Sequence, residues 1–363
     1  MSLADVGKLS LVVVRNGDSV SATEIRSTRP MAAQILKGKT AAQVLQVVPL
    51  LFSVCGKAQG EAASAVLQAA QQRDMPASAA AMERMIACEA MQEHLWRLLL
   101  DWPKLLEMPQ QEQRFARWYA LLRKIGAGEL DMADFRQEFV RDCLGMTTAE
   151  WQGIDSYSAL QTWWRENESQ VAQLLSALDA VACGRADRGS VRLLPAWSAA
   201  QANSACSGRW DAAFSAQPDW LGSAAETGAW AYHADDVLLC DVWQKTGSMA
   251  LTRLLARVLD VVEMASGNAV ARLDATSPAA GEGVAVVRTA RGVLLHRVLL
   301  DGDKVVDYAI IAPTEWNFHS NGAFAQDMRG VVGKDEESLK KLAQIAALSL
   351  DPCVAYEVEI RNA

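Results

Sequence analysis

Asp351-Pro352-Cys353-Val354-Ala355-Tyr356-Glu357-Val358-Glu359-Ile360 almost closes the chain, and Ser53-Val54-Cys55-Gly56-Lys57-Ala58-Gln59-Gly60-Glu61-Ala62 lies near its other end. Each stretch carries one cysteine, and the chain contains no CxxC pair. Behind Cys55, residues 61–73 are rich in alanine with apolar residues at helical spacing, which predicts a helix. Cys55 then lies just before a helix N-terminus, where the partial positive charge is expected to favour the thiolate, the form that binds metal.

The composition is that of a soluble globular protein. The 363 residues are 51% hydrophobic and 21% charged, which is enough for one large core. We predict a single domain over residues 1–363 with an irregular, tryptophan-anchored segment at about 184–222. The net charge of −8 and the absence of a long basic run argue against a nucleic-acid footprint.

The compartment is predicted from apolar runs and cysteine usage. The longest apolar runs, such as residues 44–54, fall short of the roughly 20 residues that a membrane helix needs. The N-terminus has no signal-peptide pattern. Seven cysteines, an odd number, argue for reduced thiols. These features predict a cytoplasmic protein without a membrane span.

Local patterns predict a mixed α+β fold that is mostly helical. Strands flank Asn16-Gly17-Asp18 and Asp301-Gly302, which predicts two β-hairpins. A stripe of apolar residues ended by Pro103 predicts a long helix, in which Cys88 is a core residue and His94 is hydrogen-bonded within the fold. Cys240 is interpreted as a core residue, and Cys143 and Cys183 are interpreted as structural. Helices are predicted over 61–73, 78–102, 112–126, 131–145, 158–182, 242–264 and 335–348.

Taken in order, these stretches resemble the large subunit of nickel-iron hydrogenases, whose metal motifs are RxCGxCxxxH and DPCxxCxxH. In that family the first cysteine of each motif is terminal on nickel, and the second bridges nickel to an iron that carries cyanide and carbon monoxide. Cys55 and Cys353 match the terminal positions, so the resemblance implies that the two chain ends meet at one site. The other motif positions are changed, with Ala58 and Tyr356 at the bridging cysteines and Ala62 and Glu359 at the histidines.

These changes argue against hydrogen chemistry. Alanine has no donor atom, and a phenol is a poor replacement for a soft thiolate. The glutamate that the family uses in proton transfer falls at about Ala33, so a general acid and base is also missing. We therefore expect no catalytic residues, no enzyme activity and no nickel.

Two further residues match the family's cyanide donors. The stretch Arg288 to His296 and the stretch Lys304 to Asn317 resemble the family's PRG and PTTWN regions. The resemblance implies that Arg291 lies over the iron and that Thr314 donates a hydrogen bond to a cyanide, which is an anionic acceptor. The alternative is that Arg291 caps a turn and Thr314 stabilises a strand end.

A chain with this set of retained and lost residues resembles the HupK/HoxV-type hydrogenase expression/formation proteins. The resemblance implies a maturation scaffold that carries iron as a transient Fe(CN)2(CO) unit between HypC/HypD-type maturation proteins and the apo hydrogenase large subunit. Two alternatives stay open at this point. One is a non-catalytic structural subunit of a hydrogenase complex, and the other is a thiol-redox enzyme that uses Cys55 and Cys353.

Overall fold

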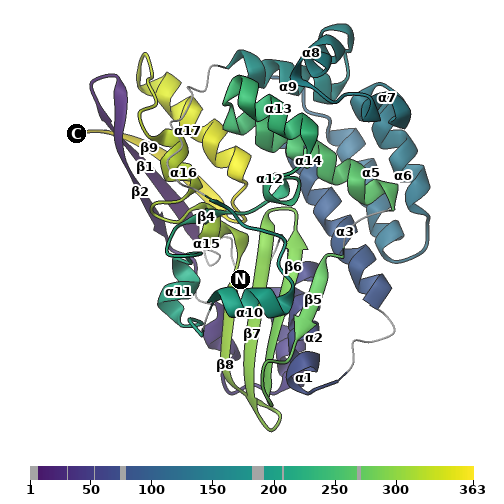
Figure 1. Ribbon diagram of the computed structural model, residues 1–363, viewed down its shortest axis with the longest axis vertical. Coiled ribbons are helices and arrows are strands. Elements are labelled where there is room, and N and C mark those ends of the chain that lie inside the picture. Colours follow the sequence, from purple (N-terminus) through teal and green to yellow (C-terminus); the bar gives the residue numbers. More distant parts are fainter. Residues whose placement is uncertain are drawn as a thin grey trace.

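The computed structural model describes residues 7–30, 32–52, 54–73, 79–181, 192–206, 208–267 and 271–363. It has the predicted α+β fold, in which helices predominate (Figure 1). Three parts lie around the centre of the molecule: a small sheet that contains both ends of the described chain, a four-stranded sheet, and a bundle of helices.

The small sheet joins the two chain ends. Strand β1 (Lys8–Asn16) forms the predicted hairpin with β2 (Ser19–Ser27), and Gly17 in the turn has a φ of 62° that favours glycine. On its other side β1 pairs in parallel with β9 (Ala355–Asn362), with Leu9 opposite Tyr356. Helices α16 (Ala323–Met328) and α17 (Glu336–Leu350) supply the apolar residues that cover this sheet.

The four-stranded antiparallel sheet has the order β5-β6-β7-β8 and contains the second predicted hairpin. Its strands are β5 (Leu273–Thr276), β6 (Glu282–Thr289), β7 (Gly292–Asp301) and β8 (Lys304–Ile311). Helices α1 (Ala41–Leu51) and α2 (Gly56–Ala70) pack on one face, and α10 (Ala199–Cys206) packs on the other. A Cβ added to Gly283 would lie 2.1 Å from the Val66 carbonyl oxygen, so β6 and α2 approach closely.

The helical bundle is built around one large apolar core. It includes α3 (Ala79–Trp96), α4 (Trp102–Leu105), α5 (Glu112–Gly126), α6 (Met132–Phe139), α7 (Thr148–Gln152), α8 (Tyr157–Glu166), α9 (Gln170–Ala180), α12 (Ala229–Tyr232), α13 (Val237–Thr246) and α14 (Met249–Ser266). Cys88 is buried in this core, as predicted, and Cys143 is buried there too. Cys240, predicted to be a core residue, is only partly buried because it lies near the start of α13, and Cys183 lies outside the described residues.

Four predicted helices have wrong boundaries. The helix expected over 61–73 is α2, which begins at Gly56 and ends at Ala70. The helix expected to end at Pro103 passes through a π-helical turn, η3 (Arg97–Asp101), into α4, because proline is tolerated in the first turn of a helix. The helix expected over 158–182 is interrupted where Ser169 caps α9. The helix expected over 242–264 is interrupted at Gly247, whose φ is 62°, before Ser248 caps α14.

The tryptophan-rich segment is more regular than predicted where the structure describes it. It contains β3 (Arg192–Leu193), α10 and α11 (Ala212–Ala216), followed by β4 (Ala225–Glu226). The prediction that its tryptophans anchor it to the core is confirmed. The Trp197 ring packs edge-on against Trp220 and Trp316, at centroid distances of 6.0 Å in both cases.

Candidate functional site

Cys55 and Cys353 come from elements at opposite ends of the chain. Cys55 is the N-cap residue of α2, and Cys353 lies between α17 and β9. Both side chains are partly buried, and they are near enough that Cys353 raises the pKa of Cys55. The two thiols that the sequence singles out therefore lie at one site.

The expectation that the start of α2 favours the Cys55 thiolate is wrong. The Glu89 carboxylate accepts hydrogen bonds from the backbone N–H groups of Lys57, at 3.0 Å, and Ala58, at 2.8 Å. The first turn of α2 is therefore capped by Glu89 and not by the thiol. Burial raises the pKa of Cys55 above its ordinary value, and the charges of Cys353 and Glu93 raise it further. Cys55 is a neutral thiol in the chain alone.

Thr314 lies in direct contact with Cys353. It belongs to the short helix α15 (Pro313–Asn317), so it does not stabilise a strand end. Its hydroxyl donates to the Cys353 sulfur at 3.1 Å and accepts from the Cys353 backbone N–H at 3.2 Å. This pair of bonds fixes the threonine oxygen beside the thiol.

Arg291 lies in the turn between β6 and β7, and its guanidinium group is buried. It donates through Nη1 to Glu93, and its Nε lies 3.3 Å from Asp351. Its Nη2 is buried without a hydrogen-bond partner among the described residues. Since an unpaired buried N–H group costs free energy, this nitrogen is suited to an acceptor that the chain does not supply.

Two carboxyl groups beside Arg291 differ in their protonation. Burial alone would raise the pKa of Asp351, but Arg291, Arg97 and Arg257 outweigh burial and hold this pKa well below its usual range. Arg97 Nε donates to Asp351 Oδ1 at 2.6 Å, and Arg257 Nη1 donates to Asp351 Oδ2 at 3.1 Å. Burial raises the pKa of Glu93 to about 8. Asp351 is therefore ionised at neutral pH, while Glu93 carries a proton for much of the time.

The buried ion pairs of helix α14 were not found from the sequence. Helix α14 carries a signal that could have revealed them, because Arg253, Arg257 and Asp260 interrupt an otherwise apolar helix. Buried charges have to be paired, so such residues predict partners from distant segments. Arg253 pairs with Glu226 at 2.8 Å and with Asp327.

His94 is the hydrogen-bonded histidine that the sequence predicts. Its Nε2 lies 2.8 Å from Asp260, and burial lowers its pKa. His233, Asp260 and Glu263 form a separate group of possible metal ligands among the described residues. Asp260 is already bonded to Arg272, at 2.6 Å, so its charge is matched without a metal.

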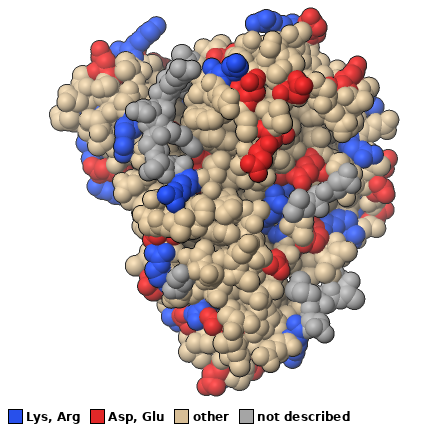
Figure 2. Space-filling model, viewed as in Figure 1, with Lys and Arg blue, Asp and Glu red and all other residues tan. Residues whose placement is uncertain are grey.

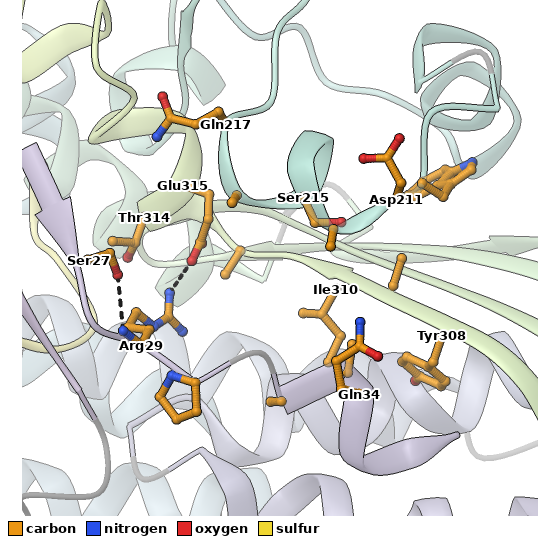
Figure 3. A pocket seen from close by; sticks show the side chains of 18 of the residues that line it. Ser27, Arg29, Gln34, Asp211, Ser215, Gln217, Tyr308, Ile310, Thr314 and Glu315 are labelled. Carbon is orange, nitrogen blue, oxygen red and sulfur yellow. Dashed lines mark hydrogen bonds and ion pairs between the residues drawn. The ribbon is translucent and has the colours of Figure 1, made fainter. Parts of the chain in front are cut away.

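A cavity of about 700 Å³ extends from Thr314 along β8 (Figure 3). At its inner end Arg29 donates to Glu315 at 2.6 Å. Burial alone would lower the pKa of Arg29, but the nearby Cys353, Glu315 and Cys55 outweigh burial and raise it, which places this ion pair near the thiols. On the face shown in Figure 2, basic and acidic side chains are interspersed.

Comparison with known proteins identifies the family. The chain is 32% identical to the hydrogenase expression/formation protein HupK of Azotobacter vinelandii, over 98% of this chain and 99% of that protein. It is 30% identical to the hydrogenase expression/formation protein HoxV of Cupriavidus necator, over 92% of each chain. The chain belongs to the HoxV/HupK family of hydrogenase expression/formation proteins. The model of the nickel-dependent hydrogenase family matches residues 221–358 of this HoxV/HupK member.

Solved structures show that the HoxV/HupK chain has the fold of hydrogenase large subunits. The Ni-Fe-Se hydrogenase of D. vulgaris Hildenborough in the reduced state aligns with a TM-score of 0.60 at 14% identity, covering 94% of this chain and 95% of that chain. An NAD+-reducing [NiFe]-hydrogenase aligns with a TM-score of 0.58 at 16% identity, covering 94% of each. None of the described helices is long and apolar enough to cross a membrane.

The positions of the two missing bridging cysteines are occupied by residues that do not supply a thiolate. Ala58 is buried in the first turn of α2, where its N–H group is bonded to Glu89. Tyr356 lies in β9, and burial raises its pKa to about 12. Its phenol is therefore neutral at physiological pH, which makes it a poor ligand for a soft metal.

Proposed function

We propose that this member of the HoxV/HupK family is a maturation scaffold, not an enzyme, and that it binds and hands over the Fe(CN)2(CO) unit during assembly of the nickel-iron hydrogenase active site. The single observation that carries the proposal is the set of groups around Cys55 and Cys353. The two thiols lie near the Arg291 guanidinium group, whose Nη2 is buried without a hydrogen-bond partner among the described residues.

The groups present fit the chemistry of this cargo. Thiolates bind iron, and cyanide is an anionic acceptor that suits a charged N–H donor. Arg291 offers its free Nη2 to one such acceptor. The Thr314 hydroxyl, which is bonded to Cys353 at 3.1 Å, can turn toward an acceptor while its oxygen keeps the backbone N–H of Cys353.

The protonation of Cys55 suits a carrier better than a permanent site. Because burial raises the pKa of Cys55, binding of iron has to release a proton, which lowers the apparent affinity at neutral pH. Reprotonation of this thiol then favours release of the cargo to an acceptor. The same raised pKa argues against the thiol-redox alternative, since the thiolate is the reactive form.

Nickel is not expected to bind. In the family it has four cysteine ligands, and here Ala58 and Tyr356 leave two. The donors and acceptors of the cargo are proposed to be the HypC/HypD-type proteins and the apo hydrogenase large subunit, in keeping with the family's name. The names of the relatives support a role in hydrogenase formation.

Anaerobic purification with metal analysis tests this proposal. The chain should carry iron, without stoichiometric nickel, and should co-purify with the maturation proteins or the apo large subunit. Cys240→Ser is a suitable control, because the Cys240 sulfur donates to the Ala234 carbonyl at 3.3 Å and a serine hydroxyl can donate to the same oxygen. Stoichiometric nickel, or recovery of neither partner with the wild-type chain, would contradict the proposal.

A further inference from the structure

Among the described residues, the outer edge of β8 has no backbone hydrogen-bond partner along most of its length. At its beginning, Val305 is bonded on this side to the segment that precedes α1, by Gly38 N–H to Val305 O at 2.8 Å and Val305 N–H to Lys39 O at 2.9 Å. From Asp307 to Ile311 no described backbone group outside β7 pairs with the strand. An unpaired strand edge presents a row of N–H and C=O groups to an added strand.

The 700 Å³ cavity lies along this edge. Four successive residues, Asp307 to Ile310, line it. Since alternate residues of a strand point to opposite faces, a cavity on one face would be lined by every second residue. A lining of consecutive residues therefore places the cavity beside the backbone edge of β8. The opposite walls come from the β1–β2 hairpin, from η2 (Ala32–Leu36) and from α11.

One wall of the cavity carries a polar group without a partner. Ser215 of α11 is 7% exposed, and its hydroxyl has no hydrogen bond among the described residues. Figure 3 shows this side chain facing the cavity above β8. A buried hydroxyl without a bond costs free energy, so this position is suited to a ligand with a donor or an acceptor.

The charges that line the cavity balance one another. The cations are Arg29, Lys37 and Arg297, and the carboxylates are Asp211, Asp307 and Glu315. Arg29 lies 2.6 Å from Glu315, Lys37 lies 2.8 Å from Asp307, and Arg297 lies 3.1 Å from Asp307. Each cation is thus already paired, which favours an occupant without charge.

We infer that an uncharged, extended peptide segment of the protein that exchanges the iron unit docks along Asp307 to Ile311 as an added strand. This inference rests on the proposed function and names the docking surface for it. β8 leads through Ala312 and Pro313 to Thr314, whose hydroxyl is bonded to Cys353. A segment that follows the edge therefore ends beside the thiols, and its backbone provides the affinity.

Two alanines of α11 give a matched pair of variants. Ala216 and Ala213 are both exposed on this short helix, but Ala216 lines the cavity and Ala213 does not. In Ala216→Trp the indole should fill the cavity, whereas in Ala213→Trp it should remain in solvent. Both variants are expected to fold, because neither alanine is in the core.

The test uses the full chain with two probes, a purified HypC–HypD-type complex that carries the iron unit and the apo large subunit. Hydrogen exchange of peptides that cover 306–311 should slow when a probe binds. Ala216→Trp should weaken binding about tenfold or more, while Ala213→Trp binds like the wild type. Ser215→Ala should weaken binding by a smaller factor.

Three outcomes would overturn the inference. The first is equal binding by the two tryptophan variants without a change in exchange at 306–311. The second is that hydrogen exchange at 306–311 is already slow in the absence of a probe and becomes fast when the chain is diluted. This result would make a second copy of this chain the occupant. The third is that neither probe binds the wild-type chain. Cys353→Ser separates the two proposals, since this variant should still bind the probes but should no longer bind iron. If the variant binds the probes and its iron content equals that of the wild type, only the proposed function is contradicted.

Discussion

At the scale of single residues, the fold changes the protonation of Glu93 at neutral pH. Burial raises its pKa to about 8, whereas a glutamate in the unfolded chain titrates near 4.3. The folded chain holds the extra proton between these values, so this group makes the free energy of unfolding decrease as the pH rises from about 4.5 to 8.

Glu93→Gln should remove this contribution. We expect the free energy of unfolding of the variant, measured by denaturant titration, to change less between pH 5 and pH 8 than that of the wild type. Glu129→Gln, at an exposed position, serves as the control and should behave like the wild type. An equal or larger loss of stability with rising pH in Glu93→Gln would contradict the assigned protonation.

Glu89 is a second residue with a testable role, because it caps α2 from a different helix. Its carboxylate bonds two backbone N–H groups, at 3.0 and 2.8 Å. Glu89→Ala should lower the free energy of unfolding by about 2 kcal/mol, since it leaves both N–H groups without a partner. Asp131→Ala, which removes a single exposed cap bond to Ala133, should cost less. If thermal or denaturant unfolding shows the same loss in free energy of unfolding for both variants, the Glu89 cap stabilises the fold no more than an ordinary exposed cap does.

The sequence predicted some residues of the candidate site and missed others for a physical reason. Cys55, Cys353, Arg291 and Thr314 follow from motifs that are continuous in the chain. The carboxylate cap of α2 does not, because Glu89 reaches it through tertiary packing. The prediction of a Cys55 thiolate used only the local helix end, and it failed because burial and distant charges dominate the pKa.

At the scale of elements, local signals located most helix ends. Helix α5 begins at Glu112 and ends at Gly126 as predicted, and Asp335 caps α17. The failures lie where packing decides the outcome. Arg97 is the first residue of the π-helical turn η3, and its Nε donates to Asp351 Oδ1 at 2.6 Å. Asp351 is far away in the sequence, so no local pattern could indicate this bond or the irregular turn.

The close approach of β6 and α2 gives a prediction at this scale. A Cβ at Gly283 would lie 2.1 Å from the Val66 carbonyl oxygen and 2.9 Å from the Ala70 nitrogen, so a backbone has to move. Gly283→Ala should therefore lower the free energy of unfolding by about 3 kcal/mol or more. Gly302→Ala has open space but a φ of 60°, and it should cost about 1 kcal/mol. A smaller loss in Gly283→Ala than in Gly302→Ala would contradict the packing described here.

At the scale of the whole molecule, the fold joins the two chain ends. The β1–β2 hairpin follows from its Asn-Gly turn, but the parallel pairing of β1 with β9 has no local signal. Parallel strands from opposite ends of a chain meet only after the segments between them have packed. The resemblance to hydrogenase large subunits therefore predicted that the ends meet, whereas the residue pattern alone did not.

In the function proposed for the molecule, Cys55 and Cys353 hold an iron unit with cyanide and carbon monoxide ligands. Infrared spectroscopy tests it most directly, because bound cyanide and carbon monoxide absorb where the protein does not. Freshly and anaerobically purified wild-type chain and Cys240→Ser should show both kinds of band, and Cys353→Ser should be folded but show neither. Undiminished bands in Cys353→Ser, or no bands in wild-type chain purified together with its maturation partners, would contradict the account.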